Sequence, residues 1–218
     1  MKNVTRTYTQ GKEKIFALRE TNITVCPGEF IAVVGPSGSG KSTFLTIAGA
    51  LQGSSKGVVT IDGTETNKLS VKELSKLRLE HVGFILQASN LVPYLRIKDQ
   101  LKLIDVVLKR KTDDDVVDSL FKELAIDKLA NKYPGDLSGG ERQRSAIAKV
   151  LYGTSKLILA DEPTASLDTE KAFSVVKLLA QETHERKKAT IMVTHDTRLL
   201  DFCDHVYEMK DGILTKTR

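Results

Sequence analysis

The chain has 218 residues, of which 40% are hydrophobic and 28% charged, and its formal net charge is +5. This length suits one α/β domain with a smaller subdomain. No apolar run reaches the roughly 20 residues of a membrane-spanning helix, and the N-terminus lacks a signal-peptide core. The basic excess is small and dispersed, so it does not demand nucleic acid as a partner. Cys26 and Cys203 form no CxxC, and we interpret them as reduced structural thiols of a cytosolic protein.

Short apolar runs alternate with longer amphipathic segments. In chain order we expect strand 30–34, helix 41–51, strands 58–61 and 82–86, helices 97–109, 113–124 and 138–152, strand 156–160, helix 169–186, strand 189–194, and a closing hairpin of 205–209 with 212–215. Strands that are apolar throughout indicate a mostly parallel sheet covered on both faces. The segment 87–136 shows no convincing strand, so we predict one domain with an α/β core (1–86 and 137–218) and an inserted helical subdomain.

A phosphate-binding loop follows the first apolar strand. The stretch GPSGSGKS fits the pattern G-x-x-x-x-G-K-[ST], and it stands between a strand and a helix as that pattern requires. Backbone N–H groups of such a loop surround phosphate oxygens, while the lysine reaches the terminal phosphates and the serine hydroxyl faces Mg²⁺. The predicted nucleotide-binding residues here are Gly35, Pro36, Ser37, Gly38, Ser39, Gly40, Lys41, Ser42 and Thr43.

Polar side chains follow three other strands of the predicted sheet. Asp161 and Glu162 end the strand 156–160, His195 follows 189–194, and Gln87 follows 82–86. The carboxyl ends of parallel strands meet at one edge, where ligands collect. We expect Asp161 to hold Mg²⁺ and Glu162 to polarise a water molecule aimed at the γ-phosphate. His195 is expected to contact that phosphate, and Gln87 to reach the metal or the attacking water.

A pair of adjacent glycines stands at the start of the predicted helix 138–152. The stretch DLSGGERQR runs from Asp136 to Arg144, and a glycine-rich helix start of this kind is suited to phosphate. The chain therefore carries two phosphate-binding sequences about a hundred residues apart.

The ordered set resembles the ATP-binding subunits of ABC transporters. The Leu-Ser-Gly-Gly signature is the most diagnostic element, because other phosphate-loop ATPases lack it, and the resemblance covers essentially the whole chain. It implies a phosphate-loop NTPase core with a mostly parallel sheet, an N-terminal antiparallel β region and an inserted helical subdomain. It also implies ATP and Mg²⁺ as cofactors, and two chains bound head to tail, with each nucleotide between the phosphate loop of one and the signature of the other.

The same resemblance implies individual roles. It assigns catalysis to Lys41, Glu162 and His195, magnesium binding to Ser42, Gln87 and Asp161, and further nucleotide contacts to Gln87, Ser138, Gly139, Gly140, Glu141 and Asp168. Tyr8 lies near the position of the aromatic that stacks on adenine, and Phe16 is the alternative. Because the chain begins at MKNVTRTY, the first strand, which usually precedes this aromatic, is expected to be shortened or missing.

The nearest subfamily resembles the ATPases of macrolide-exporter and lipoprotein-releasing transporters. The stretch GFILQASNLVPYLRIKDQL is similar to the ATPases of haem-efflux transporters in Gram-positive bacteria. The implied partner is a transmembrane permease, with the chain bound peripherally at the cytoplasmic face of the membrane. Leu91 to Leu95 is either subdomain core or part of a groove for a permease helix. The alternatives are an ABC-type ATPase acting on nucleic acid or ribosomes, and a non-hydrolysing nucleotide-binding regulator.

Overall fold

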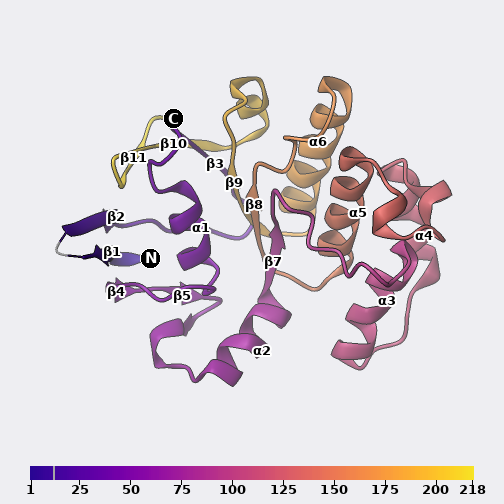
Figure 1. The fold of residues 1–218 in the computed structure, drawn as a ribbon, viewed down its shortest axis with the longest axis horizontal. Helices are drawn as coiled ribbons and strands as arrows, with labels where there is room; N and C mark the ends of the chain where they lie inside the picture. Colours follow the sequence, from indigo (N-terminus) through magenta and orange to yellow (C-terminus); the bar gives the residue numbers. More distant parts are fainter. Residues whose placement is uncertain (12) are drawn as a thin grey trace.

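The computed structural model describes residues 1–11 and 13–218 (Figure 1). Its helices are α1 (Lys41–Ala48), α2 (Val71–His81), α3 (Ile97–Leu108), α4 (Asp114–Glu123), α5 (Gly139–Tyr152) and α6 (Thr169–Glu185). Its strands are β1 (Lys2–Gln10), β2 (Glu13–Thr21), β3 (Phe30–Val34), β4 (Lys56–Val58), β5 (Thr60–Ile61), β6 (Thr64–Glu65), β7 (Val82–Ile85), β8 (Leu157–Asp161), β9 (Ala189–Val193), β10 (His205–Lys210) and β11 (Ile213–Lys216).

The predicted parallel sheet is confirmed. Six strands lie in the order β11-β10-β3-β9-β8-β7, and all neighbours are parallel except the closing hairpin of β10 and β11. A separate antiparallel sheet has the order β2-β1-β4. The phosphate loop follows β3, so it stands near the middle of the larger sheet, with the ends of β8 and β9 beside it (Figure 1).

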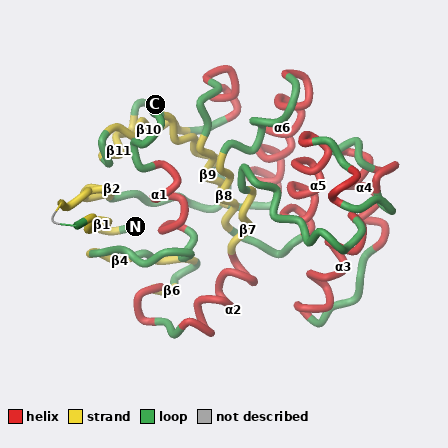
Figure 2. The backbone as a smooth tube through the Cα atoms, in the orientation of Figure 1, coloured by secondary structure: helices red, strands yellow, loops and turns green. Residues whose placement is uncertain are grey.

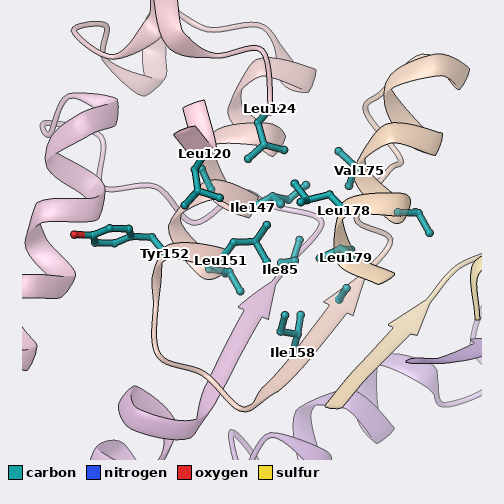
Figure 3. Packing of buried hydrophobic residues seen from close by; sticks show 14 of the residues in the cluster. Ile85, Leu120, Leu124, Ile147, Leu151, Tyr152, Ile158, Val175, Leu178 and Leu179 are labelled. Carbon is teal, nitrogen blue, oxygen red and sulfur yellow. The ribbon is translucent and has the colours of Figure 1, made fainter. Parts of the chain in front are cut away.

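The strands bury both faces, and alternate residues belong to two separate cores. In β3, Phe30 and Ala32 pack with residues of α5 and α6, whereas Ile31 and Val33 pack with α1 and the N-terminal strands. Figure 3 shows the first core from close by, with the side chains of α5 and α6 meeting above β7 and β8. This two-sided burial explains why β3 is apolar at every position.

Helices and turns, without a strand, fill the described chain between β7 and α5. Helices α3 and α4 pack beside α5, on the far side of the parallel strands from the antiparallel sheet (Figure 2). The limits 87 and 136 of a helical subdomain stay a prediction. Among the helices of the described residues, none has the length and apolar character needed to cross a bilayer.

Two elements differ from the sequence prediction. The first strand was expected to be shortened or missing, but β1 runs from Lys2 through Tyr8 to Gln10 and pairs with β2 and β4, so it is not missing. Helix α2 was not predicted, because it buries only Leu77 and shows little periodicity. It begins instead through a local cap, in which Ser70 and Glu73 each accept a hydrogen bond from the other's backbone N–H.

Candidate functional site

The phosphate loop has a backbone that only glycine allows at its two ends. Gly35 has φ 146°, and a Cβ there would lie 2.1 Å from the carbonyl oxygen of Met209. Gly40 has φ 108°, and its Cβ would lie 2.3 Å from the carbonyl oxygen of Ala17. Helix α1 begins at the next residue, so the loop ends at a helix N-terminus with its free N–H groups. The loop that the sequence pattern predicts therefore has a backbone suited to an anion.

The functional side chains of the loop lie beside the acidic end of β8. The Lys41 ammonium donates hydrogen bonds of 2.8 Å to the carbonyl oxygens of Gly35 and Pro36, so it stays close to the loop backbone. The Ser42 hydroxyl donates to Oδ2 of Asp161 at 3.1 Å. A hydroxyl and a carboxylate, both oxygen donors, thus meet where the sequence predicts a metal.

Glu162 and His195 meet at the neighbouring strand ends. Glu162 Oε2 lies 2.9 Å from Nδ1 of His195. The Glu162 side chain is 16% exposed, whereas that of His195 is 74% exposed. Glu162 adopts a left-handed backbone conformation with φ 49°, and its N–H donates to the carbonyl oxygen of Val193 at 3.0 Å. A β-sheet partner thus holds a glutamate in a backbone state that costs about 1–2 kcal/mol, as is common at functional sites.

One cavity of about 820 Å³ joins these groups. Its lining includes residues of the phosphate loop from Ser37 to Thr43, together with Gln87, Asp161, Glu162 and His195. Side chains from four separate regions of the sequence therefore converge on one space, as expected from the carboxyl ends of neighbouring parallel strands.

The two candidate aromatics differ in their relation to this cavity. Phe16 is 54% exposed and lines the cavity. Tyr8 lies on the paired strand, donates to Oε1 of Gln52 at 2.9 Å and has the Arg6 guanidinium 4.7 Å from its ring centroid. Burial acts to raise the pKa of Tyr8, but hydrogen bonds with Arg6, Gln52 and Thr43 lower it overall, and Thr43 is part of the cavity wall.

The signature sequence forms the capped start of α5. The Ser138 hydroxyl accepts a hydrogen bond of 3.3 Å from the N–H of Glu141, and the Glu141 carboxylate accepts one of 2.8 Å from the N–H of Ser138. The bond from the Ser138 N–H holds the pKa of Glu141 below its usual value. The Glu141 carboxylate is therefore engaged within its own helix cap, and its predicted contact with a nucleotide stays a prediction.

A second cavity of about 510 Å³ lies at this helix start. Its lining includes Ser138, Gly139, Gly140, Glu141, Asp168 and Lys171, and none of its lining residues belongs to the first cavity. Asp168 caps α6 and pairs with the Lys171 ammonium, which holds the pKa of the Asp168 carboxyl below its usual range. The two glycine-rich sequences thus line two different cavities of the chain, and sequence reasoning had not singled out Lys171.

The chain is similar in sequence and in structure to known proteins. Residues 18–165 match the family model described as "ABC transporter". The chain belongs to the ABC transporter family. Within it, the chain is an ATP-binding subunit and an ATPase, like the ATP-binding proteins to which it is similar.

Several relatives match over nearly the full length. The chain is 42% identical to "Putative hemin import ATP-binding protein HrtA" of Staphylococcus haemolyticus, over 97% of this chain and 96% of the relative. It is 38% identical to "Uncharacterized ABC transporter ATP-binding protein MJ0796" of Methanocaldococcus jannaschii, over 97% and 93%. A solved structure of the "ATP-binding cassette MJ0796 bound to ADP and Pi", described as dimeric and post-hydrolysis, superimposes with a TM-score of 0.92 at 37% identity, covering 100% of this chain and 97% of that one. The predicted fold class and family are confirmed.

Proposed function

We propose that the first cavity binds ATP, with its phosphates in the loop from Gly35 to Thr43 and its adenine toward the side where Tyr8 and Phe16 lie. The loop supplies backbone N–H groups and the Lys41 ammonium, which suit a polyphosphate. Phe16 lines the cavity and Tyr8 contacts the lining residue Thr43, so both aromatics are candidates for stacking on the base.

The residues present fit Mg²⁺. Ser42 Oγ and Asp161 Oδ2 lie 3.1 Å apart, and Gln87 lines the same cavity. The described residues contain no cluster of three or more His, Cys, Asp and Glu side chains that would hold a metal without help. This agrees with Mg²⁺, which is usually held by one or two protein ligands together with phosphate and water. Bound there, Mg²⁺ would neutralise the charge that develops on the phosphates.

We further propose that the working unit is a head-to-tail pair of chains. The observation that carries this proposal is that the phosphate loop and the signature line two cavities with no residue in common. In a pair related by a twofold axis, the first cavity of one chain can face the second cavity of its partner, which forms two equal nucleotide sites. Ser138, Gly139 and Gly140 would then supply a second helix N-terminus to the γ-phosphate.

Glu162 and His195 would carry the chemistry. The Glu162 carboxylate can accept the proton of a water molecule that attacks the γ-phosphate. The imidazole of His195, 2.9 Å away and largely exposed, can hold both the carboxylate and the phosphate. Lys41 and the loop N–H groups stabilise the charge that builds on the γ-phosphate oxygens, and loss of the phosphate removes the contact that joins the two chains.

The same reasoning extends to a membrane partner. Gln87 lines the nucleotide cavity, and the segment from Leu91 to Leu95 follows it directly. Leu91 packs against the helical core, whereas Tyr94 is 77% exposed. We propose that Tyr94 and its neighbours receive a permease, so that events at Gln87 pass to that partner and the chain lies at the cytoplasmic face of the membrane.

We propose haem as the cargo and export as the direction. The cargo is supported by the printed name of the staphylococcal relatives, which contains "hemin". The direction is supported by the resemblance to exporter ATPases, although the name of these staphylococcal relatives contains the word "import". The alternative function, an ATPase acting on nucleic acid or ribosomes, has no comparable support, because the matching family is described as a transporter family.

Mixed pairs test the composite site. Chains with Ser138→Arg and chains with Lys41→Ala are each expected to be inactive alone. Mixed in equal amounts, half of the pairs are heterodimers in which one site has both lesions and the other has none. We therefore expect ATPase activity to return to about a quarter of the wild-type rate, since one in four sites is intact. A mixture as inactive as its two components would contradict action across the interface.

Transport in inside-out vesicles tests cargo and direction. The chain is co-expressed with the membrane protein that co-purifies with it, and vesicles are supplied with ATP and hemin outside. Export predicts ATP-dependent accumulation of hemin in the vesicle lumen, and vesicles with Glu162→Gln are the control. Release of preloaded hemin on ATP addition would show import, and no ATP-dependent movement in either direction would refute haem as the cargo.

A further inference from the structure

A cavity of about 500 Å³ lies at the other end of the sheet from the nucleotide cavity. It shares no lining residue with the cavities at the phosphate loop or at the signature. Its lining includes Leu157 and Ala189, the first residues of β8 and β9, together with Lys2 and Val58 of the antiparallel sheet. Neither the ATPase reaction nor the proposed transport function uses it. Its volume lies within the range of small-molecule sites, roughly 300–1,000 Å³.

The floor of this cavity is apolar. Ala48, Ile61, Ala189 and Ile191 line it, and each is less than a tenth exposed. They come from α1, β5 and β9, so the floor lies where three elements of the core meet. None of these four side chains has a polar group that would need a hydrogen-bond partner. The apolar part of a ligand that displaced water from this surface would therefore bind by the hydrophobic effect.

The rim of the cavity is basic. Lys2, Lys156 and Lys187 line it together with one acid, Asp62. Lys156 is already paired, because its Nζ lies 2.8 Å from Oδ2 of Asp62. Within residues 1–11 and 13–218, Lys2 and Lys187 form no ion pair. Two unpaired ammonium groups at the mouth of an apolar cavity favour an occupant with an anionic end.

We propose that this cavity is a second ligand site, for an amphipathic organic anion with an apolar body and one carboxylate or sulfonate, and that its occupancy is coupled to the nucleotide site. The apolar body lies on Ala48 and Ile191, and the anionic group lies between Lys2 and Lys187. A purely apolar ligand would form no ion pair with the ammonium groups, and inorganic phosphate would leave the apolar floor in contact with water.

Three elements connect the two sites. Helix α1 begins at Lys41 and ends at Ala48, β8 runs from Leu157 in this cavity to Asp161, and β9 runs from Ala189 toward His195. An occupant therefore contacts the opposite ends of the elements that carry the phosphate-binding and catalytic side chains. A close-packed core transmits small displacements along such rigid elements, which provides the coupling.

Displacement of a fluorescent anion tests the site. 8-Anilinonaphthalene-1-sulfonate is titrated into the full chain, and dodecanoate is then added as competitor. We expect dodecanoate to displace the probe, and the uncharged dodecanol to displace it at least tenfold less well. The variant Lys2→Glu/Lys187→Glu should weaken dodecanoate at least about tenfold, because two attractive charges become repulsive. The matched control is Lys72→Glu/Lys177→Glu, which changes the net charge equally at exposed lysines outside the cavity.

A second variant fills the cavity. Val58→Trp places a bulky ring at a half-buried lining position on β4. This variant should abolish the displacement of the fluorescent probe by dodecanoate, while nucleotide binding persists. Equal dodecanoate affinity in the Lys2→Glu/Lys187→Glu variant and in wild type would overturn the site, as would equal displacement by dodecanol. For the coupling, dodecanoate affinity is measured with and without a non-hydrolysable ATP analogue. A change of about fivefold or more is expected, and identical affinities would refute the coupling.

Discussion

Replacing Glu162 by glutamine tests the catalytic assignment most directly. The exchange removes the charge of the carboxylate and keeps the size of the side chain. Both residues meet the same cost at φ 49°, so the backbone strain cancels between variant and wild type. The contact with Nδ1 of His195, now 2.9 Å from Oε2, can be kept by an amide oxygen.

The expected effects follow from these contacts. Loss of a general base lowers kcat by roughly 10²–10⁴-fold, which corresponds to about 3–5 kcal/mol of barrier. Because the His195 side chain is 74% exposed, its pairing with Glu162 contributes at most about 1 kcal/mol to folding. The free energy of unfolding should therefore change little. ATP affinity should stay near wild type, because Lys41 and the loop N–H groups are unchanged.

Three measurements separate the possibilities. Phosphate release gives kcat, equilibrium binding of labelled ATP gives affinity, and gel filtration with ATP shows whether a closed pair accumulates. Glu208→Gln, on the exposed side of β10, is the matched control and should leave turnover unchanged. Turnover of Glu162→Gln within about tenfold of wild type would refute the role as base. Loss of ATP binding would show that the residue supports the site rather than the chemistry.

The remaining predictions concern the adenine contact and the thiols. Two variants, Tyr8→Ala and Phe16→Ala, identify the stacking ring. The variant that removes this ring should weaken ATP binding by roughly 1 kcal/mol, about fivefold, and GTP binding is measured for comparison. Equal ATP affinity in both variants and wild type would exclude stacking at either ring. Burial raises the pKa of the Cys203 thiol to about 12, so this thiol stays protonated and unreactive at pH 8 in the folded chain. Iodoacetamide should therefore modify only the exposed Cys26 until denaturant is added, and rapid labelling of both thiols in the folded chain would contradict the burial.

The sequence predicted which candidate site residues lie together better than it predicted the elements around them. A phosphate loop can be predicted from a short stretch of sequence. Backbone contacts require glycine at Gly35 and Gly40, and Lys41 and Ser42 follow at fixed spacing. The convergence of Asp161 and His195 followed from parallel strands, whose carboxyl ends meet at one edge. These signals depend on short segments and on general rules of topology, so a single sequence was enough.

Other features depend on contacts between distant segments. The left-handed backbone of Glu162 is fixed by the carbonyl of Val193, which no local pattern reveals. Strand β2 is mostly exposed, so it lacks the alternation that identifies a half-buried strand. The predicted helix 41–51 ends at Ala48, and its C-cap is Gly49, where a Cβ would lie 2.0 Å from the Phe84 ring. Packing against Phe84 requires a glycine at this cap, and the local sequence does not reveal that contact.

The strand order has a consequence for how the protein is made. Strand β3, which carries the phosphate loop, is hydrogen-bonded on one side by β9 and on the other by β10. The loop itself is closed by the late residue Gly212, whose N–H donates to the carbonyl oxygen of Ser39 at 2.9 Å. A growing chain, made at about 5–20 residues per second, thus emerges with its phosphate loop well before the strands and the turn that hold that loop. We therefore expect the loop to take its final form only after Gly212 has left the ribosome, and a chain stopped before β10 to carry the motif without these contacts.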